Sequence, residues 1–510
     1  MKHIKLVWIL VALLSIVYAE EDVEVNGEEE TQTLSIDYDE EGSEKHSLKC
    51  NMIHLYDELP NEVDNLGDMF SQGMFYWRMR FNSFGLKWKE EIERDNGTKV
   101  RSNHVVGAIG GSLIYKSAIL NGFSFGTGLY TSQGLGNLDS TDAYLYKGGK
   151  GLFSRYDLLT DESINLTSLA QAYLQYTYED TSMKVGRQIV RSFLTKSNDT
   201  KMIPNTFEGV TLKSRAISDT AIHMAYLTKQ KLRDHSDFHH VLAAGDDPDD
   251  PYTLFTQNDD SAMHFGLGLS KLQERGIDDR LVIAEVRNES VDDMVLTMNY
   301  TAVPELVSSA MLQAEYRLYL AGFTMIPGLR YMKQFDDGAG EIGGANLKTL
   351  TEGYVDPESL DSELYGARLD FVENGIKVRL GYTKIADEGD IIAPWRGFPT
   401  GGFTRSMAQY NWYANTETYM VQLDYDLGFF SDTKIISRFA VQDFDDSKVG
   451  VQADSRVIEV NFFKGLGENP IYYKARLGHA MGDDDTYAAN GVLKPDPSYT
   501  ELRFEVNYLF

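Results

Sequence analysis

Basic residues recur at every second position inside segments that alternate polar and apolar side chains, and they are the residues best suited to chemistry on small anions. An arginine guanidinium binds both oxygens of a carboxylate and stays charged. A row of such groups in a water-filled passage lets an anion move onward without being trapped. We call ten of these residues the basic ladder: Arg78, Arg80, Arg215, Arg330, Arg368, Arg379, Arg438, Lys474, Arg476 and Arg503. Lys213 and Lys377 fall on the same inward-facing side of their segments as the ladder residues do.

Neighbouring acids offer a simpler explanation of the same residues. Buried charges in proteins are normally paired, so basic side chains can serve only to neutralise nearby carboxylates. The pairs closest in sequence are Glu315 with Arg317, Asp370 with Arg368, and Glu505 with Arg503. The ladder and the ion-pair network both remain open at this stage.

The segments that carry these residues have the two-residue period of a β-strand, whose successive side chains face opposite sides. At the end of the chain, Leu502, Phe504 and Val506 alternate with Arg503 and Glu505. About 18 such segments predict an all-β fold, a transmembrane antiparallel β-barrel with apolar faces toward lipid and polar faces toward a wet lumen. Their approximate spans are 74–84, 104–117, 120–131, 167–179, 181–189, 208–217, 219–229, 280–288, 293–303, 309–321, 327–335, 363–373, 375–385, 416–428, 432–444, 454–464, 469–480 and 499–510.

The gaps between these segments alternate between long and short, as long extracellular loops and short periplasmic turns require. The long gaps fall near 85–103, 132–166, 190–207, 230–279, 336–362, 386–415 and 481–498. In the fourth of them we expect a helix over 261–275, capped near Asp259, Asp260 or Ser261. The mean hydropathy of −0.33 fits a barrel, because only every second wall residue faces lipid.

The N-terminal region divides the remaining chain into three parts. Residues 1–19 have a short positive start, an apolar run and Ala19 before an acidic run, which predicts a signal peptide. Residues 20–65 are acidic and predict a periplasmic tail that is mostly mobile, in which the apolar stretch from Met52 to Leu59 can dock. Residues 66–510 would form the barrel in a bacterial outer membrane, folded there by the export and barrel-assembly machinery.

Composition excludes several other classes of function. A net charge of −29 argues against binding to nucleic acid. The acidic runs at 246–250 and 483–485 fit solvated loops better than divalent bridges to lipopolysaccharide. His235, His239 and His240 lie near two aspartates, but loop histidines without a defined geometry are seldom ligands, so we expect no metal and no cofactor.

Two stretches resemble the OprD family of outer-membrane porins. Val185-Gly186-Arg187-Gln188 followed by Asn198 to Val210 is similar to the region that leads into the third loop of that family. Arg405-Ser406-Met407-Ala408-Gln409-Tyr410, before the strand near 416–428, is similar to its seventh loop. The resemblance implies a narrow, 18-stranded pore for amino acids, small carboxylates or related solutes, with a basic ladder and with the loops near 190–207 and 386–415 folded inward.

On this resemblance, the pore constriction would use residues of both inward loops. They are Arg191, Lys196, Asp199 and Lys201 from the first, and Arg396, Arg405 and Tyr410 from the second. The expected partners are small solutes, membrane lipid and lipopolysaccharide, with the chain a monomer or a trimer. One alternative is a barrel plugged by the 230–279 loop, which would serve binding or adhesion. A second is an outer-membrane hydrolase that uses His223 or His264. No spacing of catalytic residue types supports the hydrolase, so we expect no enzyme.

Overall fold

The computed structural model describes residues 45–93, 97, 99–146, 151–196, 201–246, 266–406, 410–427, 433–466 and 469–510. The predicted signal peptide and the first part of the acidic tail therefore lie outside the described residues. The same holds for Asp199, for His264 and for the predicted helix cap at 259–261.

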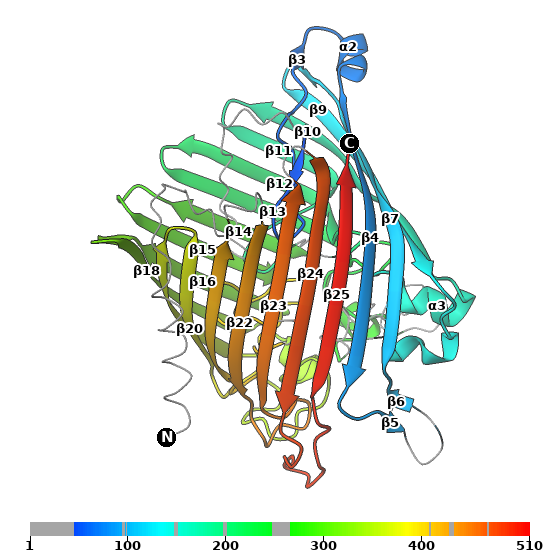
Figure 1. Cartoon of the computed structure of the whole chain (residues 1–510), viewed down its shortest axis with the longest axis vertical. Coiled ribbons are helices and arrows are strands. Elements are labelled where there is room, and N and C mark those ends of the chain that lie inside the picture. Colours follow the sequence, from blue (N-terminus) through cyan, green and yellow to red (C-terminus); the bar gives the residue numbers. More distant parts are fainter. Residues whose placement is uncertain are drawn as a thin grey trace.

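Eighteen long strands of the described residues close into one antiparallel barrel (Figure 1). The barrel closes where the last strand pairs with the first, with Leu509 opposite Arg78. The strands are β4 (Met74–Trp88), β7 (His104–Lys116), β9 (Phe123–Leu135), β10 (Asn165–Tyr178), β11 (Thr181–Gln188), β12 (Thr206–Ile217), β13 (Thr220–Lys231), β14 (Leu281–Asn288), β15 (Met294–Val303), β16 (Val307–Tyr316), β18 (Phe323–Asp336), β19 (Ser362–Glu373), β20 (Ile376–Ile385), β21 (Glu417–Asp426), β22 (Thr433–Asp443), β23 (Ser455–Leu466), β24 (Asn469–Gly482) and β25 (Tyr499–Leu509).

The strands confirm the predicted barrel, and one predicted segment is interrupted. The segment expected at 309–321 divides into β16 and the short β17 (Leu318–Leu320). The break falls at Arg317, whose backbone N–H donates to the carbonyl of Asp293, the residue before β15, at 2.8 Å. The remaining short strands are β1 (Ser47–Leu48), β2 (His54–Leu55), β3 (Glu62–Val63), β5 (Ile92–Glu93), β6 (Lys99–Arg101) and β8 (Ile119–Leu120).

The wall has an apolar outer face and a polar inner face. On β4, Phe75, Trp77 and Met79 are about half exposed, whereas Tyr76 and Arg78 between them are buried. An apolar surface that continues around a closed barrel is stable in lipid, where the closed sheet also pairs its backbone polar groups. Within the described residues, no helix is long and apolar enough to cross a membrane.

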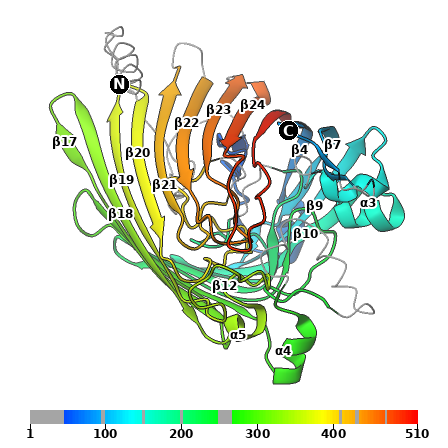
Figure 2. The same cartoon turned by 90° about the horizontal axis from the view of Figure 1, so that it is seen from below.

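Long and short connections lie at opposite ends of the barrel, which we call the long-loop end and the short-turn end. Four of the long connections are loop 3 (189–205), loop 4 (232–280), loop 7 (386–416) and loop 8 (444–454). Figure 2, which views the long-loop end, shows coil segments inside the ring of strands. The helices are α2 (Leu66–Ser71), the 3-10 helix η1 (Ser140–Leu145), α3 (Arg155–Asp161), α4 (Leu269–Arg275) and α5 (Ala339–Gly343).

Helix α4 confirms the helix predicted at 261–275 over its second half. Helix α4 begins at Leu269, with Gly268 as its N-cap, and ends before Gly276. Residues 266–268 are not helical, and there the backbone N–H of Gly266 donates to the carbonyl of Leu347. The rest of the predicted helix, 261–265, lies outside the described residues.

Loops 3, 4 and 7 share one buried apolar core with the inner wall at the long-loop end. Phe193 and Leu194 of loop 3 pack in this core with Leu242 of loop 4 and Trp395 of loop 7. The indole N–H of Trp395 donates to the carbonyl of Val241 at 2.7 Å. The apolar core fixes the three loops relative to one another, because separating them would expose all of these side chains to water.

Residues 45–65, which the composition predicts to be part of a mostly mobile acidic tail, are folded against the barrel. The strands β1 and β2 form a small hairpin, and Met52 and Ile53 at its turn are buried. Figure 2 shows dark blue ribbon of this segment inside the ring of strands, and Figure 1 shows its later part, at β3, at the rim. The segment is acidic on average, but its apolar turn buries enough surface to hold it in place.

Candidate pore site

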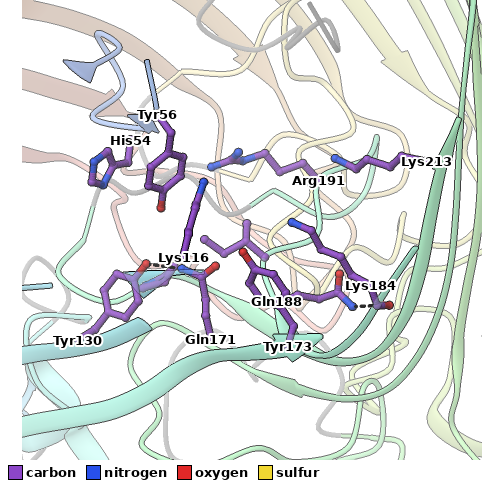
Figure 3. Close-up of a pocket in the computed structure, with 12 residues that line it drawn as sticks. His54, Tyr56, Lys116, Tyr130, Gln171, Tyr173, Lys184, Gln188, Arg191 and Lys213 are labelled. Carbon is purple, nitrogen blue, oxygen red and sulfur yellow. Dashed lines mark hydrogen bonds between the residues drawn. The ribbon is translucent and has the colours of Figure 1, made fainter. Parts of the chain in front are cut away.

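A cavity of about 150 Å³ lies inside the barrel, against the inner faces of five neighbouring strands (Figure 3). Loop 3 and the segment that follows β1 complete it. The residues that line it are His54, Tyr56, Lys116, Tyr130, Gln171, Tyr173, Lys184, Gln188, Ile189, Arg191, Pro204 and Lys213.

Strand parity directs the basic side chains into this cavity. On β11, Met183 and Val185 are exposed on the outer face, so Lys184 between them faces inward. Lys213 on β12 lies opposite Ser182, two pairs from the pair that Lys184 forms with Thr211 on the same two strands. Figure 3 shows the ends of Lys184, Lys213 and Arg191 converging from one side, with Lys116 reaching up from the other.

The lining of the cavity is strongly basic. Four of its twelve residues are lysine or arginine, and none of the twelve is aspartate or glutamate. The carboxylate of Glu285, from β14, instead accepts hydrogen bonds from the backbone N–H of Phe193 at 2.8 Å and from Asn299 at 2.9 Å. A cavity walled by protein and lined by one sign of charge concentrates the opposite ion.

Loop 3 places its predicted residues in different surroundings. Arg191 lines the cavity. Lys201 is buried, its ammonium lies 3.6 Å from the ring centroid of Phe84, and its carbonyl accepts a hydrogen bond from Arg80. Lys196 is half-buried at the end of the described part of the loop.

Loop 7 gathers its predicted arginines around one aromatic ring. The guanidinium of Arg405 stacks 3.4 Å from the ring centroid of Phe398, and that of Arg396 lies 5.4 Å from it. Tyr410 makes an edge contact with Trp412 at 4.7 Å. Loops 3 and 7 meet where Thr195 forms a single bridge with Arg396.

Two ladder residues hold loop 7 against the wall. Arg330 on β18 donates to the carbonyls of Pro399 and Gly401, both at 2.7 Å. Arg368 on β19 donates to the carbonyl of Gly402 at 3.0 Å. Loop 7 approaches so closely that a β-carbon on Gly381 would lie 2.0 Å from the carbonyl oxygen of Phe403.

Most of the other ladder residues lie beside carboxylates on their own or a neighbouring strand. Arg379 binds Asp370 through two hydrogen bonds of 2.7 Å. Glu505 lies among Arg78, Arg80 and Arg503, and Arg503 reaches it at 2.6 Å. Arg438 and Arg476 share Glu459 at 3.3 and 3.4 Å. Lys474 lies 4.5 Å from the ring of Phe463, whereas Arg215 is exposed near the short-turn end.

The structure corrects one of the ion pairs suggested by sequence proximity. Glu315 binds Arg368 at 2.7 Å. Arg317 follows the last residue of β16 and is exposed. The other two pairs form, Arg368 with Asp370 at 3.7 Å and Arg503 with Glu505.

Sequence reasoning missed most of the cavity. Lys184 and Tyr173 have inward parity, and alternation with exposed apolar neighbours was the signal that could have found them. Lys116 is the last residue of β7, where alternation gives little guidance. No periodicity marks His54 and Tyr56, because the segment that carries them is not part of the wall.

The histidines of loop 4 serve to fold the loop. A hydrogen bond of 2.6 Å joins Nδ1 of His235 to Nε2 of His239. Another, of 2.7 Å, joins Nδ1 of His240 to the carboxylate of Asp279. Asp279 also accepts the backbone N–H of Leu242 at 2.8 Å. Among the described residues, no group of three or more histidine, cysteine or acidic side chains is arranged to hold a metal ion.

Comparison with known proteins agrees with this architecture. A family model described as outer membrane porin, OprD family, matches residues 137–431, more than half of the chain. The structure of Pseudomonas aeruginosa OpdK with vanillate is similar at a TM-score of 0.64 and 12% identity, over 87% of this chain and 99% of that one. No curated protein matches the sequence significantly.

Two further solved structures show the same fold. Pseudomonas aeruginosa OccK8 (OprE) gives a TM-score of 0.63 at 13% identity, over 87% of this chain and 99% of that chain. Acinetobacter baumannii OccAB3 gives 0.63 at 14% identity, over 86% of this chain and 100% of that chain. At such identities the likeness concerns the fold.

A closed barrel with an apolar outside and a polar, partly hollow inside is an outer-membrane channel for small solutes. This class places the protein in the outer membrane of a bacterium. More particularly, the chain belongs to the OprD family of outer membrane porins, whose model matches it over most of its barrel.

Proposed function

We propose that this channel prefers small carboxylates, and the basic lining of the cavity is the observation that carries the proposal. A carboxylate entering the cavity meets lysines 116, 184 and 213 together with Arg191. The carboxylate exchanges its hydration shell for hydrogen bonds from charged donors on several sides. A neutral or cationic solute cannot form these charge-assisted bonds in the same cavity. Four separate cations also let the anion shift from one to another, which passage requires.

The aromatic lining extends the proposal to carboxylates with a planar ring. Tyr56, Tyr130 and Tyr173 line the same cavity as the four cations, and aromatic rings stack favourably on one another. The similar OpdK structure is a complex with vanillate, which is an aromatic carboxylate. The predicted constriction and basic ladder extend this path toward both ends of the barrel as part of the proposal.

The proposal is tested by ion selectivity in planar bilayers and by liposome swelling. We expect a reversal potential that indicates anion preference, and faster swelling with benzoate than with neutral sugars or with cationic amino acids. The double variant Lys184→Gln/Lys213→Gln should reduce both preferences.

A matched control uses the same substitution on the outer face of the barrel. Lys333 and Lys384 have outward parity and lie near Glu363 and Glu417, at 2.8 and 3.6 Å. The variant Lys333→Gln/Lys384→Gln should keep the selectivity of the parent. Equal selectivity in all three proteins would refute the carboxylate proposal.

A plugged barrel for binding or adhesion is the second candidate, because of the apolar core at the long-loop end. That core joins loops 3, 4 and 7 with the inner wall. Discrete conductance steps from the purified protein support the channel, whereas a barrel that inserts and stays silent supports the plug. Contacts with lipopolysaccharide and assembly as a monomer or a trimer stay predictions.

A further inference from the structure

The segment from residue 45 to residue 59, which we call the inner strap, lies inside the short-turn end of the barrel. Its turn reaches the inner wall at β22 and β23, where Met52 packs in a buried cluster with Ile436 and Phe463. The side-chain amide of Asn507 on β25 lies 3.5 Å from the sulfur of Met52. Ile436, Phe463 and Asn507 are all buried on the lumenal side of their strands.

The other side of the inner strap contacts β4 and β7. The hydroxyl of Tyr76 donates to the carbonyl of Glu58 at 2.6 Å. Tyr56 makes an edge contact with Tyr76, with 4.7 Å between the ring centroids. The ammonium of Lys116 lies over the ring of Tyr56, 3.2 Å from its centroid. The strap therefore follows the lumenal wall over six consecutive strands, from β22 through β25 and on to β4 and β7.

Both ends of the inner strap are fastened at the rim. The ammonium of Lys45 donates to the carbonyl of Phe75, and the ring of His46 lies 3.2 Å from the carbonyl of Phe510. Beyond the strap, β3 pairs in parallel with β8, with Glu62 opposite Ile119. A segment that is held at both ends and at its turn occupies a constant place in the lumen.

The contact between Tyr56 and Lys116 determines how one cation of the cavity is presented. A lysine side chain is long and flexible, and a cation over an aromatic face is held by electrostatic attraction. Tyr56 therefore keeps the ammonium of Lys116 at the cavity, opposite Lys184 and Arg191 (Figure 3).

We propose that the inner strap is a built-in filter at the short-turn end of the channel: it narrows the lumen, and Tyr56 is a specificity-determining residue that positions Lys116 for anions. The first half of this inference, the narrowing, is independent of the proposed carboxylate preference. The second half rests on that preference. Single-channel conductance reports the narrowing, and reversal potential reports the anion preference, so the two fail separately.

The test compares three variants in planar bilayers. Tyr56→Ala removes a ring that lines the cavity and should raise single-channel conductance by about two-fold while weakening anion preference. Tyr56→Phe retains the ring face and should keep the anion preference of the parent. Tyr300→Ala removes a half-exposed tyrosine on the outer face of β15 and is the matched control, without effect on either quantity.

The natural Cys50 gives a second test, in which the parent protein is labelled without any substitution. It is the one cysteine of the chain, and it packs beside the cluster around Met52. A bulky, negatively charged thiol reagent added from the short-turn side should lower conductance in the parent and leave Cys50→Ser unchanged. If mass spectrometry showed complete labelling of Cys50 and the conductance stayed the same, the proposed narrowing would be overturned. If the parent were anion-selective and Tyr56→Ala had the same reversal potential, the proposed role of Tyr56 would be overturned.

Discussion

Arg330 anchors loop 7 to the inner wall, so replacing it should change how the channel opens. Its guanidinium donates two hydrogen bonds of 2.7 Å to the carbonyls of Pro399 and Gly401, and it lies 4.4 Å from the ring of Phe403. The variant Arg330→Met keeps a long apolar side chain but donates neither bond. Gln313, whose side-chain oxygen accepts from the Nε of Arg330 at 2.8 Å, loses that donor as well.

The size of the effect follows from these contacts. Hydrogen bonds that involve a charged group contribute about 1.5–3 kcal/mol each, so two of them amount to about 3–6 kcal/mol. At about 1.4 kcal/mol for each factor of ten, loop 7 would be docked about 10²–10⁴-fold less favourably. The figure is an upper bound, because Arg368 still holds Gly402 and the hydroxyls of Thr383 and Thr404 still lie 2.6 Å apart.

Single-channel recording reads this change directly. The parent should hold one open level for long periods, and Arg330→Met should add a second, larger level as loop 7 leaves the wall. Arg476→Met is the control, because it also removes a lumenal arginine but one that binds Asn461 and Glu459 of the neighbouring strand. If the Arg330 variant behaved like the Arg476 variant, the anchoring role would be refuted.

Three further predictions concern the same loops. Gly381→Val should push loop 7 from the wall without changing any charge, because a β-carbon there would lie 2.0 Å from the carbonyl oxygen of Phe403. Single-channel recordings of this variant should again show a second, larger conductance level. Gly85→Val, where the nearest neighbour of the added β-carbon is 3.7 Å away, should not show that level. Lys448→Met should loosen loop 8 from loop 7 by about 1–2 kcal/mol, since the buried ammonium binds Asp387 of loop 7 at 2.6 Å and Asp445 of loop 8 itself at 2.6 Å. Faster protease cleavage in these loops checks this prediction, and an unchanged cleavage rate would contradict it. Burial favours the neutral form of Asp445, but hydrogen bonds from Lys448 and nearby groups outweigh it and hold the pKa of that carboxyl well below its usual range. Its stabilising contribution is therefore complete above the ordinary aspartate value of about 4 and is lost as pH falls toward the lowered pKa, so protease resistance should fall with acid in the parent and fall less in Asp445→Asn.

The wall of this protein could be predicted because strand parity is a local property. Phe75, Trp77 and Met79 turn outward and Arg78 inward wherever the strand lies in the ring, since successive side chains alternate about the backbone. The C-terminal strand and the ladder arginines follow from the same rule. Parity also indicates that a residue such as Arg330 points into the lumen, but not what it will meet there.

The partners across the lumen depend on the closed barrel. Arg330 meets Pro399 and Gly401, which are about 70 positions away in sequence, because loop 7 returns along the wall. The same holds for Phe193 of loop 3 and Glu285 of β14, which are 92 positions apart. Neither contact has a periodic signal, because both join segments that the chain brings together only when the ring closes.

The sequence alone determined the approximate number of strands, the side of the wall on which most residues within a strand lie, and the place of the chain among outer-membrane barrels. Tertiary structure alone decided that an acidic N-terminal stretch enters the lumen and that His54 and Tyr56 share a cavity with Lys184 and Lys213. The physical reason is that alternation is set by neighbours along one strand. The lining of a cavity depends on side chains that face one another across the lumen. The distance between the elements that carry them is fixed only when the sheet closes.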